Sequence, residues 1–110
     1  MIHRMLGNCA VIDLERAEQW YTRVFGGPPD SRPMAGLIEW HLSATFGLQI
    51  WSDPARAGYS SVILGETDLD TAAERLIEVG IQHAGPESGG GERLLQLRDP
   101  DGNQLVLFGH

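Results

Sequence analysis

The chain has 110 residues, of which 42% are hydrophobic and 21% charged, and its formal net charge at pH 7 is −7. This length and composition are typical of one globular domain and exclude a disordered or fibrous chain. The acidic charge argues against a nucleic-acid partner, and the lack of an apolar run of about 20 residues argues against a membrane. The start of the chain, MIHRMLGNCAVIDL, is not typical of a signal peptide, and its single cysteine, Cys9, suits a reducing compartment. We therefore expect a cytoplasmic protein.

An internal repeat divides the chain into two halves. The segment VIDLERAEQWYTRVFGG from Val11 resembles ETDLDTAAERLIEVGI from Glu66, and Asp13 recurs 55 positions later as Asp68. Two copies are too few for a solenoid, so we expect a closed pair of modules within one domain, residues 1–110. The first module should span about residues 1–54 and the second about 55–110, with SDPARAGY connecting them.

Each module is predicted to contain a strand, a helix and then further strands. Aspartate at the N-cap, apolar residues at intervals of three and four, and a closing glycine (Gly26 and Gly80) indicate amphipathic helices that begin at Leu14 and Leu69. In chain order, apolar alternation predicts strands at residues 5–12, 37–42 and 48–51, and then at 60–64, 81–83, 93–97 and 104–108.

Two segments near the C-terminus carry turn signals. In DPDGN, Pro100 and Gly102 suit a type I turn with a bulged glycine, so we expect Asp99 to pair with Asn103 between two antiparallel strands. A calcium loop is excluded, because glutamine and histidine occupy the sixth and twelfth positions of the segment that begins at Asp99. ESGGGER, residues 87–93, is predicted to be a flexible connection, with a mobile lid as the alternative.

Strand alternation predicts which side chains face the helices and which face away from them. The helix-facing, apolar set is Met5, Cys9, Val11, Ile38, Trp40, Leu42, Leu48, Ile50, Leu95, Leu97, Leu105 and Leu107. The opposite set is Leu6, Asn8, Ala10, Ile12, Glu39, His41, Gln49, Trp51, Ser61, Gln96, Arg98, Gln104, Val106 and Phe108. This second set predicts a polar cleft with aromatic walls.

Three segments, VIDLERAEQWYTRVFG, DPARAGYSSVILGETDLDTAAERLIEVG and DPDGNQLVLFG, resemble the vicinal oxygen chelate superfamily. This superfamily includes glyoxalase I, fosfomycin-resistance enzymes, extradiol dioxygenases and bleomycin-resistance proteins. The resemblance covers nearly the whole chain and implies an α+β fold, in which two βαβββ modules form a curved mixed sheet around a cleft. It also implies a homodimer, because paired modules leave strand edges that a second subunit can cover.

Metal-using members of this superfamily place His, Gln or Glu ligands on the first and last strands of each module. On this sequence the resemblance assigns those positions to Leu6, Trp51, Ser61 and Val106. A shift of two residues would bring Gln49 to the position of Trp51, and that would still provide a single ligand. We therefore expect neither a metal nor another cofactor, because a divalent ion needs several oxygen or imidazole donors. Relocated ligands, namely Glu39, His41 and Gln49 on one hairpin, are the alternative.

The resemblance indicates a protein that binds a small organic molecule, and three functions remain open. The first is sequestration of a cationic, partly planar ligand, as in the drug-resistance branch. The second is a metal-independent enzyme that transfers protons, and the third is a metal-dependent lyase or dioxygenase with relocated ligands. The catalytic candidates are His41 and Glu39, with an exposed ion pair as the alternative interpretation. The ligand-binding candidates are Asn8, Gln49, Trp51, Ser61, Gln96, Gln104, Val106 and Phe108.

Overall fold

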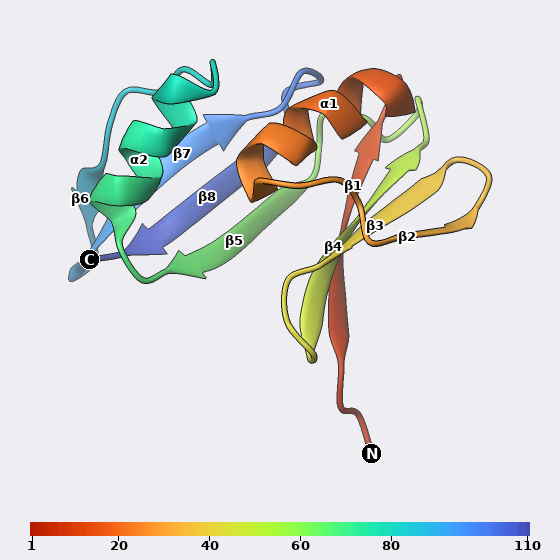
Figure 1. Cartoon of the computed structure of the whole chain (residues 1–110), viewed down its shortest axis with the longest axis horizontal. Helices are drawn as coiled ribbons and strands as arrows, with labels where there is room; N and C mark the ends of the chain where they lie inside the picture. The colour runs from red at the N-terminus through yellow and green to blue at the C-terminus, as the bar shows by residue number, and fades with distance from the viewer.

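The computed structural model describes residues 1–110 and contains two βαβββ modules (Figure 1). The first module comprises β1 (Met5–Val11), α1 (Leu14–Phe25), β2 (Ser31–Met34), β3 (Leu37–His41) and β4 (Phe46–Ser52). The second comprises β5 (Ser61–Glu66), α2 (Leu69–Glu78), β6 (Glu87–Gly89), β7 (Glu92–Arg98) and β8 (Gln104–Gly109). The strands form two separate four-stranded sheets, ordered β1-β4-β3-β2 and β5-β8-β7-β6. Each sheet is mixed, because its first strand is parallel to its neighbour and the others are antiparallel.

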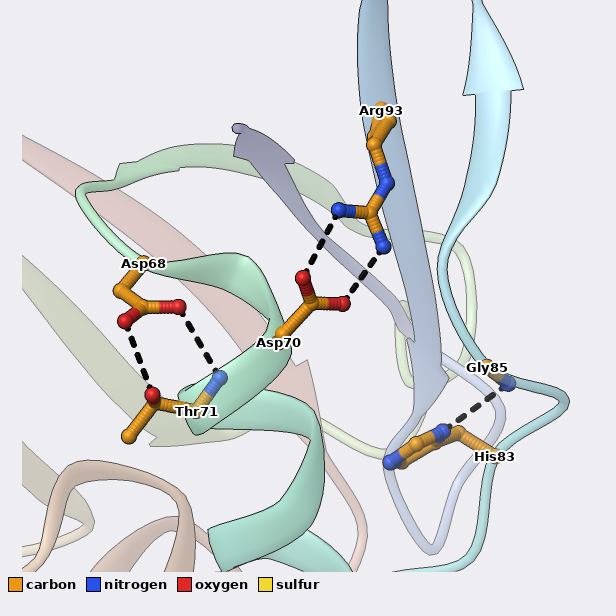
Figure 2. Close-up of polar contacts among 6 residues, drawn as sticks. All are labelled: Asp68, Asp70, Thr71, His83, Gly85 and Arg93. Atoms are coloured by element: carbon orange, nitrogen blue, oxygen red, sulfur yellow. Dashed lines mark hydrogen bonds and ion pairs between the residues drawn. The ribbon is translucent and has the colours of Figure 1, made fainter.

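Both helices begin and end where the sequence predicts. Asp13 accepts a hydrogen bond from a backbone N–H in the first turn of α1, and Gly26 closes that helix with a φ of 79°. Asp68 caps α2 in the same way, as Figure 2 shows. In that view Asp70 also pairs with Arg93, which joins the first turn of α2 to β7. Neither helix has the length and apolarity that a membrane span requires.

One apolar core lies between the helices and the two sheets. In Figure 1, α2 lies over β7 and β8, and α1 lies near the place where the two sheets approach each other. Most of the residues that alternation assigns to the helix-facing side are buried in this core, and Leu42 is partly buried against it. The prediction for Met5 is wrong, because the start of β1 extends away from both helices and leaves this side chain 71% exposed (Figure 1).

A buried polar cluster joins the two modules. Asp99, in the turn between β7 and β8, accepts hydrogen bonds from the Tyr21 hydroxyl of α1 and from the Asn103 side chain, both at 2.8 Å. Asn103 also donates to the Ala10 carbonyl at 2.7 Å and accepts from the Ser60 N–H at 2.9 Å. These contacts cover the outer edge of β1, so Ala10 is buried although alternation predicts that it faces the cleft.

The predicted turn between β7 and β8 is confirmed. The Asp99 N–H donates to the Asn103 carbonyl at 3.0 Å, and the Gly102 N–H donates to the Asp99 carbonyl at 2.9 Å. Gly102 has a φ of 91°, a conformation that favours glycine over residues with a side chain. The same turn therefore sets the register of the hairpin and positions the two residues of the buried cluster.

Predictions for two short segments are wrong, and a third segment forms a strand that was not predicted. Residues 81–83 form no strand, because the Ile81 N–H returns to the Leu76 carbonyl and completes the last turn of α2. Within ESGGGER, β6 and β7 form a hairpin through Gly90 and Gly91, whose φ values are both positive, so this segment is not a loose connection. The sequence does not predict β2, because its residues, SRPM, are mostly exposed and lack apolar alternation.

The two modules differ in the register of their sheets. Asn8 of β1 lies opposite Gln49 of β4, whereas Ile63 of β5, which follows Asn8 by 55 positions, lies opposite Val106 of β8. Gln49 and Val106 are therefore structural counterparts, although they are 57 positions apart. The repeat predicts that Trp51 is the counterpart of Val106 in the first module, and this prediction is wrong. The alternative, in which a shift of two residues makes Gln49 the counterpart, is correct.

Candidate functional site

The first candidate surface is the open face of β1, β4 and β3. Asn8 Nδ2 donates a hydrogen bond to Gln49 Oε1 at 3.3 Å, and Gln49 Nε2 donates to Glu39 Oε2 at 2.6 Å. His41 Nε2 lies 2.9 Å from the other carboxylate oxygen, Oε1. Four predicted site residues from three strands therefore form one hydrogen-bonded line, which we call the first row.

Glu39 is the buried centre of the first row, with 8% of its surface exposed. Hydrogen bonds from Gln49 and then from His41 lower the pKa of the Glu39 carboxyl, so it is ionised at neutral pH. An ionised carboxylate only accepts hydrogen bonds, and it therefore holds the imidazole as the tautomer with its proton on Nε2. The other nitrogen of His41, Nδ1, makes no hydrogen bond within the chain, and the side chain is partly exposed.

Trp51 flanks the first row. It follows Gln49 by two positions in β4, so both side chains project from the same face of the sheet. Its neighbours across the sheet are Ala10 of β1 and Leu37 of β3, and the ring is partly exposed. A tryptophan in this setting offers a flat apolar surface next to a line of polar groups.

The second candidate surface is the open face of β5, β8 and β7. Ser61 Oγ donates to Gln104 Oε1 at 3.3 Å, and Gln104 Nε2 donates to Gln96 Oε1 at 3.2 Å. Gln96 Nε2 in turn donates to a carboxylate oxygen of Glu87 in β6. These four residues form the second row, which crosses its sheet as the first row crosses the other.

The apolar part of the second surface lies beside this row. Val106 faces Ile63 across the sheet, and Phe108 faces Gly65, where the lack of a side chain leaves room for the phenylalanine ring. Val106 is buried, whereas Ile63 is 63% exposed. Arg98 does not join the row, because its guanidinium donates to the carbonyl of a residue in the β7–β8 turn.

Glu87 is a member of the second row that the sequence pattern did not predict. It lies in β6, opposite Leu94 of β7, and its side chain therefore shares a face with Gln96, two positions further along β7. The three glycines that follow Glu87 conceal this strand, because glycine provides no apolar alternation. The signal that was available is the pair Gly90–Gly91, whose tendency to form a tight hairpin turn places Glu87 on the strand before it.

The positions that the resemblance assigns to metal ligands do not form a donor set. With the register of the structure they are Leu6, Gln49, Ser61 and Val106. No three His, Cys, Asp or Glu side chains are arranged to hold a metal ion. In the alternative set, Gln49 Nε2 donates to Glu39 and His41 Nε2 lies 2.9 Å from the same carboxylate, so the three side chains contact one another. The side chains at the four positions that the resemblance assigns therefore do not fit a divalent metal.

A single chain does not enclose the two open faces in a cleft. Of all the predicted site residues, only Phe108 lines any of the five main cavities. A mostly apolar crevice lies elsewhere, between the modules, with a volume of about 220 Å³ and with Phe46 and Leu64 in its lining. A cleft bounded by the first or second row therefore needs a further wall.

Comparisons with known proteins agree on one family. The model of the Glyoxalase/Bleomycin resistance protein/Dioxygenase superfamily matches residues 2–107. The structure of a glyoxalase/bleomycin resistance protein from Catenulispora acidiphila is 28% identical, with 97% of each chain covered and a TM-score of 0.89. TnmS3, an antibiotic binding protein from Streptomyces sp. CB03234, is 25% identical over 97% of this chain and 94% of its own, with a TM-score of 0.82. A bleomycin resistance determinant encoded on the transposon Tn5 is 25% identical over 97% of each chain, with a TM-score of 0.81. No curated protein sequence matches the chain.

Proposed function

Because the chain belongs to the Glyoxalase/Bleomycin resistance protein/Dioxygenase superfamily, we propose that it binds a small organic molecule on its open sheet faces and sequesters it. The observation that carries this proposal is the first row, a hydrogen-bonded polar line that lies beside the partly exposed ring of Trp51. A few fixed polar groups next to an aromatic surface are the usual components of a small-molecule site. The similarity to an antibiotic binding protein and to a bleomycin resistance determinant supports the same function.

A homodimer is the second part of this proposal, because a second copy supplies the wall that one chain lacks. β1 and β5 are outer strands of their sheets, and Met5 and Ile63 on these strands are 71% and 63% exposed. Part of the β1 edge is bonded within the chain, where the Ala10 backbone meets Ser60 and Asn103, so the exposed aliphatic side chains carry the argument. Such side chains favour burial against a second chain. A second chain over these side chains would also close the space next to Asn8 and Ser61, which lie on the same two strands.

The dimer can be tested by size-exclusion chromatography with light scattering. The expected mass at micromolar concentration is twice the 12.1 kDa of the chain. Ile63→Glu is expected to shift the protein to the monomer, because the new charge would be buried in the interface. Ile77→Glu on α2 is the control, since Ile77 is also exposed but lies away from β1 and β5. A monomer across the whole dilution series would contradict the proposal.

Ligand binding can be tested by calorimetric titration with bleomycin, followed by mass spectrometry of the recovered ligand. We expect saturable binding at micromolar or lower concentration, with the ligand recovered unchanged. Trp51→Ala is expected to weaken binding by about tenfold, or about 1.4 kcal/mol, because the ligand loses the face of the ring. Phe46→Ala should leave the affinity unchanged, since Phe46 is an exposed aromatic residue that lines the crevice between the modules.

The outcome of this titration separates binding from catalysis. An absence of binding for bleomycin and for a panel of other planar antibiotics would rule out sequestration. A chemically altered ligand would instead favour the metal-independent enzyme, for which the contact of 2.9 Å between His41 and Glu39 is the supporting observation. In that case Glu39 orients the imidazole, and His41 Nδ1 takes up the proton. Turnover should then be lost in His41→Ala and should not depend on added metal ions.

A further inference from the structure

The crevice between the modules lies on the helix side of both sheets. In β5, Leu64 and Glu66 project from the face opposite Ser61, because side chains alternate along a strand. In β4, Phe46 shares its face with Leu48, which is fully buried in the core. The two rows lie on the other face of these sheets, so the crevice is separate from the site proposed above.

The walls of the crevice are mostly apolar and come from both modules. They comprise Val24, Phe25, Leu42 and Phe46 of the first module and Leu64 and Leu107 of the second. Phe46 is 43% exposed, whereas Leu42 and Leu64 pack partly buried against the core. An apolar group in the crevice would remove this remaining apolar surface from water. The volume of about 220 Å³ is smaller than that of pockets for drug-sized molecules, which restricts the occupant to a small molecule.

Arg75 of α2 contributes a positive charge to the lining. Its guanidinium donates from Nη1 to the Arg23 carbonyl and from Nη2 to the Val24 carbonyl, at the end of α1. A guanidinium has five N–H groups, so three of them remain without a partner. Arg75 takes part in no ion pair within the chain. A partly buried arginine with free N–H groups is well suited to a carboxylate, which can accept two parallel hydrogen bonds.

Glu66, the last residue of β5, contributes a negative charge to the same lining. Its Oε1 accepts from the N–H and the hydroxyl of Thr67, whereas Oε2 makes no hydrogen bond within the chain. Glu66 is partly buried, and it pairs neither with Arg75 nor with another basic side chain. Two unpaired opposite charges therefore border one apolar crevice, and a ligand that carries both charges can satisfy them together.

We propose that this crevice binds a free apolar amino acid as its zwitterion. The α-carboxylate accepts hydrogen bonds from Arg75, the α-ammonium group donates to Glu66, and the side chain packs against Phe46 and Leu64. The small volume restricts the ligand to a single amino acid, such as leucine, methionine or phenylalanine. Such a ligand contacts both modules and stabilises their arrangement. The site goes beyond the proposed function and does not depend on it.

Melting temperatures in the presence of L-leucine, L-methionine and L-phenylalanine test the class of ligand. With a Kd of about 1 mM, a ligand concentration of about 10 mM should raise the Tm by about 4 °C, because only the native state binds it. Leucinamide lacks the carboxylate and 4-methylpentanoate lacks the ammonium group. Each should bind at least tenfold more weakly and raise the Tm by less than about 2 °C. Glycine, which has no apolar side chain, should have no effect.

Variants test the location of the site. Arg75 also holds the end of α1, so its role is tested with leucinamide instead of a substitution. Glu66→Gln should weaken the binding of L-leucine about tenfold, whereas Glu78→Gln removes the same charge from an exposed position at the end of α2 and should leave it unchanged. Phe46→Ala should weaken L-leucine at least threefold and leave bleomycin unaffected. Trp51→Ala should have the opposite pattern.

Each outcome separates this site from the open faces. No stabilisation by any of the three amino acids would overturn the inference and leave sequestration on the open faces intact. Binding of leucinamide or 4-methylpentanoate as tight as that of L-leucine would also overturn it, because the two charges would then not select the ligand. Weaker binding of L-leucine in Trp51→Ala, with Phe46→Ala unaffected, would place the ligand on the open face and overturn the crevice as its site.

Discussion

Asp99→Ala is expected to lower the free energy of unfolding by about 4 kcal/mol, since each buried group left without its partner costs about 1–3 kcal/mol. The carboxylate of Asp99 accepts from the Tyr21 hydroxyl, the Asn103 side chain and the backbone N–H groups of Asp101 and Asn103. Asp99 and Asn103 are buried, so water cannot replace the lost bonds without opening the junction between the modules. A loss of this size approaches the whole stability of many domains.

Urea denaturation of two further variants shows whether the hydrogen bonds of the buried cluster account for the loss of stability in Asp99→Ala. Asp101 lies two positions away in the same turn, but its side chain accepts only from the exposed Ile12 N–H at 3.2 Å, so Asp101→Ala should cost less than about 1 kcal/mol. Tyr21→Phe removes one hydrogen bond and keeps the ring in the core, for an expected cost of about 1.5 kcal/mol. If Asp99→Ala and Asp101→Ala lower the free energy of unfolding equally, the buried cluster does not stabilise the junction between the modules.

Gly47→Ala is expected to destabilise the protein by about 3 kcal/mol and to abolish ligand binding. Gly47 lies in β4 opposite His41 of β3, and a methyl group at this position would overlap the Trp40 carbonyl oxygen. The two strands would have to separate, because a backbone atom cannot turn aside as the end of a flexible side chain can. Gln49 and Glu39 are paired across these strands, so the first row would also lose its geometry.

Gly27→Ala is the matched control for this experiment. No atom lies within 4 Å of the position that its Cβ would take, and its φ is not positive. The change should therefore remain within about 0.5 kcal/mol of the wild type, or stabilise slightly by restricting the unfolded chain. Urea denaturation and a bleomycin titration should be run on both variants. A Gly47→Ala protein with wild-type stability would show that β3 and β4 tolerate the side chain.

Local patterns in the sequence were sufficient for much of this fold. The N-cap aspartates, the closing glycines and the DPDGN turn each act over a few residues, so their effects can be predicted without tertiary contacts. The apolar alternation of β3, β4, β7 and β8 identifies the core face, because burial of one face requires that period of two. The same alternation placed Asn8, Gln49, Glu39 and His41 together on the other face, and hydrogen bonds join them there.

Segments without a buried face were the ones that the sequence did not predict. β2 and β6 are outer strands with a proline or glycines, and they are held by backbone pairing to a neighbour whose position depends on the whole sheet. Glu87 was missed for this reason. Ala10 was misplaced because Ser60 and Asn103 cover it from the other module, which is a contact across most of the chain.

The sequence by itself determined the repeat, the helices, the core face and the set of side chains on the open faces. Only the tertiary structure decided the register that makes Gln49 the counterpart of Val106. The physical reason is that side chains alternate with a period of two, so a shift by two residues returns every side chain to its original face. Backbone pairing between β1 and β4 distinguishes the two registers, and so do the directed hydrogen bonds from Asn8 to Gln49 and from Gln49 to Glu39.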